Sequence, residues 1–161
     1  MLHVWKREIP ELDLETEGIV ERIQKINKHL DHALNETLAE FDIDRGEWWV
    51  LTVLRRSGKP YRLSPGALAR FMGLSAGAMT NRLNNLEEAG LIRRLPDVDD
   101  RRGVIVELTD EGRHRWQESV GAQARKEALV ASALSIDEKQ TLNELLCRLM
   151  LEFEEPRQDS D

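Results

Sequence analysis

Residues 68–112 read LARFMGLSAGAMTNRLNNLEEAGLIRRLPDVDDRRGVIVELTDEG, and this stretch decides the fold that we predict for the chain. Leu68, Phe71 and Met72 recur at spacings of three and one, which gives a first short helix an apolar face. Gly73 then interrupts the pattern, as glycine does at the C-terminus of a helix. A short helix followed by a turn is therefore expected at the start of the stretch.

A second helix follows this turn. Ser75 is a favourable N-cap, because its hydroxyl can accept a hydrogen bond from a backbone N–H of the first turn. Met79, Leu83 and Leu86 recur at spacings of four and three and form one apolar stripe, and Gly90 ends the helix. Two short helices joined by a tight turn indicate a helix-turn-helix.

Two β-rich runs, at 91–95 and 104–108, follow the second helix. The segment 96–103 between them, PDVDDRRG, has the composition of a turn and contains two adjacent arginines. The order of elements is that of a winged helix-turn-helix, in which the second helix enters the major groove of DNA and the hairpin tip reaches toward the minor groove. Each piece alone would also fit a surface helix pair and hairpin without any ligand, but the combination favours DNA binding.

The charge distribution supports this interpretation. The chain has 161 residues and a net charge of −7, yet residues 55–103 carry 10 Lys/Arg against 5 Asp/Glu, a balance of +5, which leaves −12 for the remainder. A basic middle between acidic flanks is typical of a DNA-reading module on an acidic support.

Long amphipathic helices are expected on both sides of this module. The first spans 14–41 and the last opens at the capping box Ser135-x-x-Glu138. The apolar faces of these two helices consist of Ile19, Ile23, Ile26, Leu30, Leu34 and Leu38, and of Leu142, Leu145, Leu146, Leu149 and Phe153. A small winged domain cannot cover so much apolar surface, so both chain ends are predicted to form a helical dimer interface.

Shorter elements connect these parts. Asp44 is a plausible N-cap for a helix at 45–56, the segment 61–63 is expected to be an edge strand, and Ser64 with Pro65 opens the first helix of the DNA-binding unit. A further helix is expected over 109–132, with Trp116, Val120 and Ala124 on one side.

The motifs in the central stretch resemble a known family. The hairpin carries Asp100-x-Arg102-x-x-x-Val106-x-Leu108-Thr109, which is similar to the wing signature of the MarR-type transcriptional regulators. The segment 75–94 resembles the recognition helix and first wing strand of the same family. This resemblance implies a mainly α fold with a small β-hairpin wing and long N- and C-terminal dimerisation helices.

We therefore divide the chain into four parts. Residues 1–42 are an N-terminal arm and long helix for dimerisation and a possible effector pocket, and 43–112 are the winged helix-turn-helix DNA-binding domain. Residues 113–155 are C-terminal dimerisation helices, and 156–161 are expected to form a disordered tail.

The DNA-contacting residues are predicted from their positions in these elements. The candidates are Ser64, Ser75, Gly77, Ala78, Thr80, Asn81, Arg82, Arg101 and Arg102. The resemblance implies that Arg102 enters the minor groove while Asp100 orients the loop, and a guanidinium is attracted to the negative potential of a narrow groove. A solvated turn with an internal ion pair is the alternative for this loop.

The resemblance also implies a small-molecule site. In this family an aromatic-lined cavity between the dimer helices and the DNA-binding lobe binds phenolic or carboxylate effectors. The urate-responsive branch has an N-terminal Trp, an Asp on the second long helix and an Arg on the recognition helix. Trp5 resembles the N-terminal Trp, and Arg82 resembles the Arg of the recognition helix. The Asp position is occupied by Trp49, which argues against urate and leaves open a site where Arg82 faces another anionic aromatic ligand. Trp48 is a further candidate, and the alternative is that these aromatic residues belong to the core.

Other functions are disfavoured. Gly73-x-Ser75-x-Gly77 matches the nucleophile motif of hydrolases, but a helix precedes it and the chain has no room for a parallel sheet, so no enzyme is expected. His29 and His32 lack further metal ligands nearby in sequence, and Cys147 is predicted to be inert, so we expect neither metal nor cofactor.

The expected function is a cytoplasmic, homodimeric repressor that binds a palindromic DNA operator and is released by a small aromatic acid. The cytoplasmic expectation rests on the lack of a membrane-spanning apolar run or a signal-peptide core. Two alternatives remain: a constitutive DNA-binding protein without an effector, and a helical dimerisation module whose wing binds protein.

Overall fold

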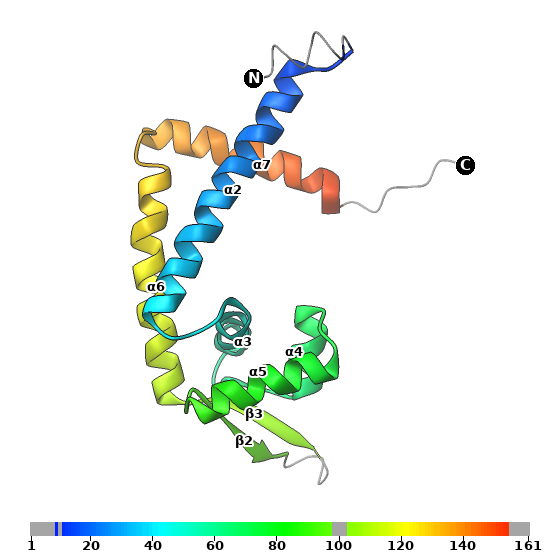
Figure 1. Ribbon diagram of the computed structural model, residues 1–161, viewed down its shortest axis with the longest axis vertical. Helices are drawn as coiled ribbons and strands as arrows, with labels where there is room; N and C mark the ends of the chain where they lie inside the picture. The colour runs from blue at the N-terminus through cyan, green and yellow to red at the C-terminus, as the bar shows by residue number, and fades with distance from the viewer. Residues whose placement is uncertain (1–8, 10, 98–102, 155–161) are drawn as a thin grey trace, which may run out of the picture. The chain divides into compact units, whose positions relative to one another are not determined.

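The computed structural model describes residues 9, 11–97 and 103–154 of the chain (Figure 1). Within them the chain is mostly helical, with one small antiparallel sheet, which confirms the predicted fold class. The elements are α2 (Leu14–Glu40), α3 (Arg45–Arg56), β1 (Arg62–Leu63), α4 (Pro65–Met72), α5 (Ala76–Glu88), β2 (Ile92–Pro96), β3 (Val104–Leu108), α6 (Asp110–Val130) and α7 (Ile136–Glu154). The described residues fall into two compact units, one that ends at Gln123 and one that begins at Ala124.

Side-chain caps fix where several helices begin. At α3 the carboxylate of Asp44 accepts from the N–H of Glu47 at 2.7 Å, and Glu47 Oε2 accepts from the N–H of Asp44 at 3.1 Å, so the two residues form a reciprocal capping box. Ser135 and Glu138 form the same arrangement at α7. These contacts confirm the predicted helix starts.

The sheet has the strand order β1-β3-β2, so β1 lies at an edge, as the sequence predicted. In the sheet, Glu107 lies opposite Arg62 on one side and Arg93 on the other. Val106 lies opposite Leu63 and Arg94. Because side chains alternate along a strand, Glu107 and Val106 point to opposite faces of the sheet. Val106 is fully buried against the helices, and Glu107 lies on the other face between two arginines.

The core lies between α3, α4, α5 and the sheet. Leu51 and Leu54 of α3 are fully buried, as is Leu68 of α4. The predicted stripe of α5 is confirmed, because Met79, Leu83 and Leu86 are each 1% exposed. Burial of these side chains contributes roughly 1.5–3 kcal/mol each, so α5 is held firmly from its inner side.

Two details of the predicted packing are wrong. Phe71, expected on the apolar face of α4, is 78% exposed, and Ala69 is buried beside Leu68 instead. On α6 the expected Ala124 is exposed, whereas Ser119 and Ala122 are buried. Small side chains let α6 approach its neighbours closely, and the hydroxyl of Ser119 accepts a hydrogen bond from an indole N–H, which a periodicity of apolar residues could not indicate.

The long helix α2 is mostly exposed, and its buried residues other than Gly18 lie near its C-terminal end. Leu38 is 2% exposed and Thr37 is fully buried, whereas Ile19, Ile23 and Ile26 farther toward the N-terminus are 42–50% exposed. Helix α7 likewise exposes Leu142, Leu145, Leu146 and Leu149. None of the described helices is long and apolar enough to cross a membrane.

Candidate nucleic-acid interface and adjoining pocket

The first turns of α5 present small polar groups to solvent. Ser75, Gly77, Thr80 and Asn81 are exposed, and Ala78 is half-buried. The opposite side of the helix is the buried stripe described above, so the exposed side is rigidly presented. An exposed, polar, N-terminal half of a short helix has the dimensions and chemistry to enter the major groove of DNA.

Two serines cap the helices of the helix-turn-helix. Ser64 Oγ accepts from the N–H of Ala67 and Ser75 Oγ accepts from the N–H of Ala78, each at 3.2 Å. A capping hydroxyl uses its lone pair toward the helix and keeps its proton for a second partner. Both serines could therefore donate to a phosphate oxygen without uncapping a helix. Gly73, in the left-handed conformation with φ of 62°, makes the turn between α4 and α5.

The wing is attached to α5 by an arginine of β2. The backbone N–H of Arg94 donates to Glu87 Oε1 at 2.9 Å, and its guanidinium donates to Glu87 Oε2 and, at 2.8 Å, to Asn84 Oδ1. These contacts join the recognition helix and the wing into one piece. The hairpin is still paired at Asp97, whose N–H donates to Gly103 O. The predicted wing residues Asp100, Arg101 and Arg102 lie outside the described residues.

A charged triad crosses the outer face of the sheet. Glu107 of the central strand is 7% exposed and accepts hydrogen bonds from Arg93 Nε and Arg62 Nε. The hydrogen bond from Arg93, supported by that from Arg62, holds the pKa of the Glu107 carboxyl below its ordinary value, against the opposing effect of burial. The triad connects all three strands. No local pattern in the sequence indicates it.

A pocket of ≈ 570 Å³ adjoins α5 on the side of α3 and α4. Its lining consists of Arg45, Gly46, Trp49, Val53, Arg56, Phe71, Met72 and Arg82. The volume is in the range that small-molecule sites occupy. Trp49 is 41% exposed and Phe71 is 78% exposed, so two large aromatic side chains adjoin the pocket with much of their surface facing solvent.

Arg82 lies against the first turn of α3. A Cβ atom added to Gly46 would be 2.6 Å from Arg82 Nε and 2.7 Å from Nη2, so only glycine leaves room for the guanidinium there. Nearby, Asn85 Nδ2 donates to Glu47 Oε1 at 3.0 Å and links the two helices a second time. Arg82 was predicted both as a DNA contact and as an effector residue, and the structure places its guanidinium at the pocket.

The predicted effector residues are only partly brought together. Arg82 and Trp49 line the same pocket, whereas Trp48 does not and donates its indole N–H to Ser119 Oγ at 3.0 Å. The predicted Trp5 lies outside the described residues. The other lining residues were not predicted from the sequence as part of the site, and they are Arg45, Gly46, Val53, Arg56, Phe71 and Met72. Of these, only a glycine within the first turn of a well-capped helix offered a signal, because it suggests close approach of another group.

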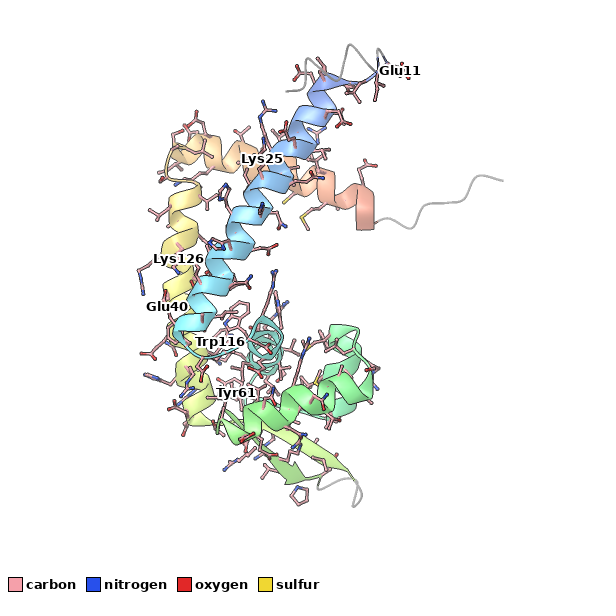
Figure 2. All side chains as sticks on the ribbon, in the orientation of Figure 1. Glu11, Lys25, Glu40, Tyr61, Trp116 and Lys126 are labelled. Atoms are coloured by element: carbon pink, nitrogen blue, oxygen red, sulfur yellow. The ribbon has the colours of Figure 1, made fainter. Side chains whose placement is uncertain are left out.

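Aromatic and polar side chains join α3 to α6. The guanidinium of Arg55 lies 4.7 Å from the ring centre of Tyr61 and 5.7 Å from that of Trp116, two residues labelled in Figure 2. Trp116 Nε1 also donates to Thr52 Oγ1 at 2.9 Å. Such contacts fix α3 on its inner side.

No metal site is found in the part of the chain that the structure describes, where no group of three or more His, Cys, Asp or Glu side chains could hold an ion. His32 lies 3.2 Å from Glu36, its neighbour one turn along α2, and Cys147 is exposed on α7.

Comparison with known proteins gives a consistent result. The model of the MarR family matches residues 41–103. The chain is 33% identical to the HTH-type transcriptional regulator PecS of Dickeya dadantii, over 90% of this chain and 87% of PecS. It is 31% identical to the multiple antibiotic resistance protein MarR of Escherichia coli K12, over 80% of this chain and 88% of MarR. A crystal structure of a mutant E. coli MarR complexed with operator DNA matches with a TM-score of 0.64 at 27% identity, covering 90% of this chain and 96% of that one.

Proposed function

The chain belongs to the MarR family of transcriptional regulators, which are not enzymes, and on this premise we propose that it is a homodimeric repressor that binds a palindromic DNA operator and is released by a small aromatic anion. The observation that carries the DNA-binding part is the geometry of α5. Its inner stripe is almost completely buried while the polar residues of its first turns are exposed. The operator complex of E. coli MarR supports the same part.

On DNA, the first turns of α5 would lie in the major groove. Thr80 and Asn81 would face base edges, and Ala78 would contact a thymine methyl group. Ser64 and Ser75 would donate to phosphates from the starts of α4 and α5. Arg101 and Arg102 would follow the DNA backbone toward the minor groove, with Asp100 orienting Arg102.

Dimerisation would use the exposed apolar residues of α2 and α7. The exposed isoleucines of α2 and the exposed leucines of α7 have 39–56% of their surface open to solvent in the single chain. Burying that surface in a two-fold interface is favourable. Two-fold symmetry would place two recognition helices about one DNA turn apart, roughly 10 bp. The operator would then be a palindrome.

Selection of bound duplexes from a random DNA pool tests this proposal, with Arg102→Ala run in parallel. We expect the wild type to enrich a palindrome and the variant to bind it more weakly. A folded dimer that enriches nothing would contradict DNA-sequence reading and favour a module that binds protein. Affinity should also fall steeply with salt, because phosphate contacts release counterions.

The effector part rests on the pocket beside α5. Arg82 is carried by the recognition helix, so an anion that draws its guanidinium into the pocket would shift α5 with it and weaken DNA binding. Aromatic rings of Trp49 and Phe71 would contact the ligand ring. Trp49 in place of a carboxylate argues against urate as the ligand.

A test of this part compares release of the selected operator by aromatic acids in the wild type and in Arg82→Ala. Release should be lost in the variant. If release persists unchanged, Arg82 is not the coupling residue. If no aromatic acid releases the wild type from its operator, constitutive DNA binding is the better description.

A further inference from the structure

The pocket has an unusual balance of charge. Three of its lining residues are arginines, Arg45, Arg56 and Arg82, and no aspartate or glutamate is among the residues that line it. Guanidinium groups remain charged at all physiological pH values and bind carboxylates with paired hydrogen bonds. A ligand with one negative charge would balance only one of these three guanidinium groups.

The arginines differ in what they already bind. Arg82 makes no hydrogen bond or ion pair with another residue in the part of the chain that the structure describes. Arg45, in contrast, is engaged, because its Nη1 lies 2.7 Å from Asp31 Oδ1 of α2. Asp31 also accepts a hydrogen bond from Asn27 Nδ2 at 3.2 Å on its other carboxylate oxygen. Among the described residues, one cation of the pocket thus has no carboxylate partner and another is paired with a carboxylate of the chain itself.

We propose that the effector is an aromatic compound with two anionic groups, one bound by Arg82 and the other by Arg45 after Arg45 leaves Asp31. This inference rests on the proposed effector function and adds the ligand class and an internal competitor. Asp31 and the second anionic group of the ligand compete for the guanidinium of Arg45. The aromatic ring lies against Trp49 and Phe71.

Release of Asp31 also removes one contact between α3 and α2. Arg45 is the first residue of α3, and α2 carries the exposed isoleucines that we assign to the dimer interface. The ligand would therefore act at two points of the DNA-binding unit, on α5 through Arg82 and on the link from α3 to α2 through Arg45. A ligand with one anionic group would act only on α5.

The expected size of the competition is modest. The side chains of Arg45 and Asp31 are 46% and 38% exposed, so water and salt screen their attraction. Ion pairs of this exposure change an equilibrium by a factor of roughly two to five. Removing the Asp31 carboxylate should strengthen binding of a dianion by about this factor.

The experiment measures binding of benzoate and of the three benzenedicarboxylate isomers to the full-length protein by calorimetry. Wild type, Asp31→Asn and Glu36→Gln are compared, since Glu36→Gln removes a carboxylate from the same helix without touching Arg45. We expect at least one dicarboxylate to bind more tightly than benzoate to the wild type. Asp31→Asn should raise the affinity for that dicarboxylate roughly two- to five-fold and leave the affinity for benzoate unchanged. Glu36→Gln should change neither affinity. Thermal unfolding and gel filtration verify that each variant folds and keeps its oligomeric state.

The outcomes separate the two levels of the proposal. If benzoate binds and releases DNA but no dicarboxylate binds better, or if Asp31→Asn and Glu36→Gln have equal effects, the effector function stands and the dianion inference is overturned. If no aromatic anion binds the wild type, the effector function itself fails, and the dianion inference fails with it. If Arg45→Gln abolishes the preference for the dicarboxylate, Arg45 is confirmed as the second anchor.

Discussion

The guanidinium of Arg82 lies so close to the α-carbon of Gly46 that a methyl group on Gly46 would be 2.6 Å from Arg82 Nε. This approach brings a residue of the recognition helix to the first turn of α3, at the edge of the pocket. A glycine at this position therefore decides whether the arginine can reach the pocket, and it offers a way to displace Arg82 without removing it.

Gly46→Ala should weaken binding of benzoate about ten-fold or more, because the displaced guanidinium can no longer form its charged hydrogen bonds in the pocket. The stability of the fold should not decrease, because only the end of a flexible side chain must move. Alanine also favours a helix over glycine by about 0.5–1 kcal/mol. Gly66→Ala is a matched control, since Gly66 is also the second residue of a helix and has open space around it. Calorimetry and thermal unfolding measure both effects, and equal binding by the two variants would contradict the role given to Arg82.

Glu107→Gln should reduce stability by about 1 kcal/mol at neutral pH, because charged hydrogen bonds to Arg93 and Arg62 are weakened. The pKa of Glu107 is lowered on folding, so its contribution is present above the unfolded pKa and is lost as the pH falls through the folded pKa. The wild type should therefore lose stability faster than Glu107→Gln below about pH 4.3, the ordinary pKa of a glutamate. Urea unfolding between neutral and acidic pH measures this, with Glu88→Gln, an exposed carboxylate, as the control. If the free energy of unfolding depends on pH in the same way for the wild type and Glu107→Gln, the ionised Glu107 carboxylate does not contribute to stability.

Arg94→Ala should weaken operator binding roughly five-fold, the effect of about 1 kcal/mol, because the wing is no longer fixed to α5. Since the Arg94 guanidinium is already bound to Glu87 and Asn84, its removal should leave the salt dependence of DNA binding unchanged. Arg102→Ala removes a cation that we assign to a DNA contact. The slope of the logarithm of the binding constant against the logarithm of the salt concentration should therefore become shallower by about 1. Fluorescence anisotropy across a salt series measures both, and a lower slope for Arg94→Ala would make it a direct DNA contact.

Gly112→Ala should destabilise the chain by about 1–3 kcal/mol, because the added methyl group would be 2.8 Å from the carbonyl carbon of Leu91 and 3.0 Å from Leu108 Cδ1. Thr109 fixes the same corner, since its hydroxyl accepts from the N–H of Gly112 at 2.9 Å and donates to Leu91 O at 3.0 Å. Each kcal/mol lost should lower the Tm by roughly 2–4 °C. An unchanged Tm would mean that the start of α6 shifts without cost.

The helices and strands were largely predictable because their signals are local. Ser64 and Ser75 cap the helices that follow them, Gly73 takes the left-handed conformation, and the stripe of Met79, Leu83 and Leu86 is buried. Caps, breakers and periodicity act within a few residues of one another, so they can be read along the chain. The motif of the wing and recognition helix also indicated the family before any fold was known.

The pocket and the ion-pair networks depended on the tertiary structure. Arg45 and Asp31 are 14 positions apart, and Arg62 and Glu107 are 45 apart, and no local pattern brings such pairs together. Phe71 was predicted to be buried because periodicity records polarity and not which side of a short helix meets the core. Amino-acid sequence alone determined the winged helix-turn-helix, since each of its elements is specified by neighbouring residues. Only tertiary packing decided the rest. The packing of α3 against α4 and α5 places Arg82 on Gly46 and selects the side chains that line the pocket, and the packing of α3 against α6 directs Trp48 to Ser119.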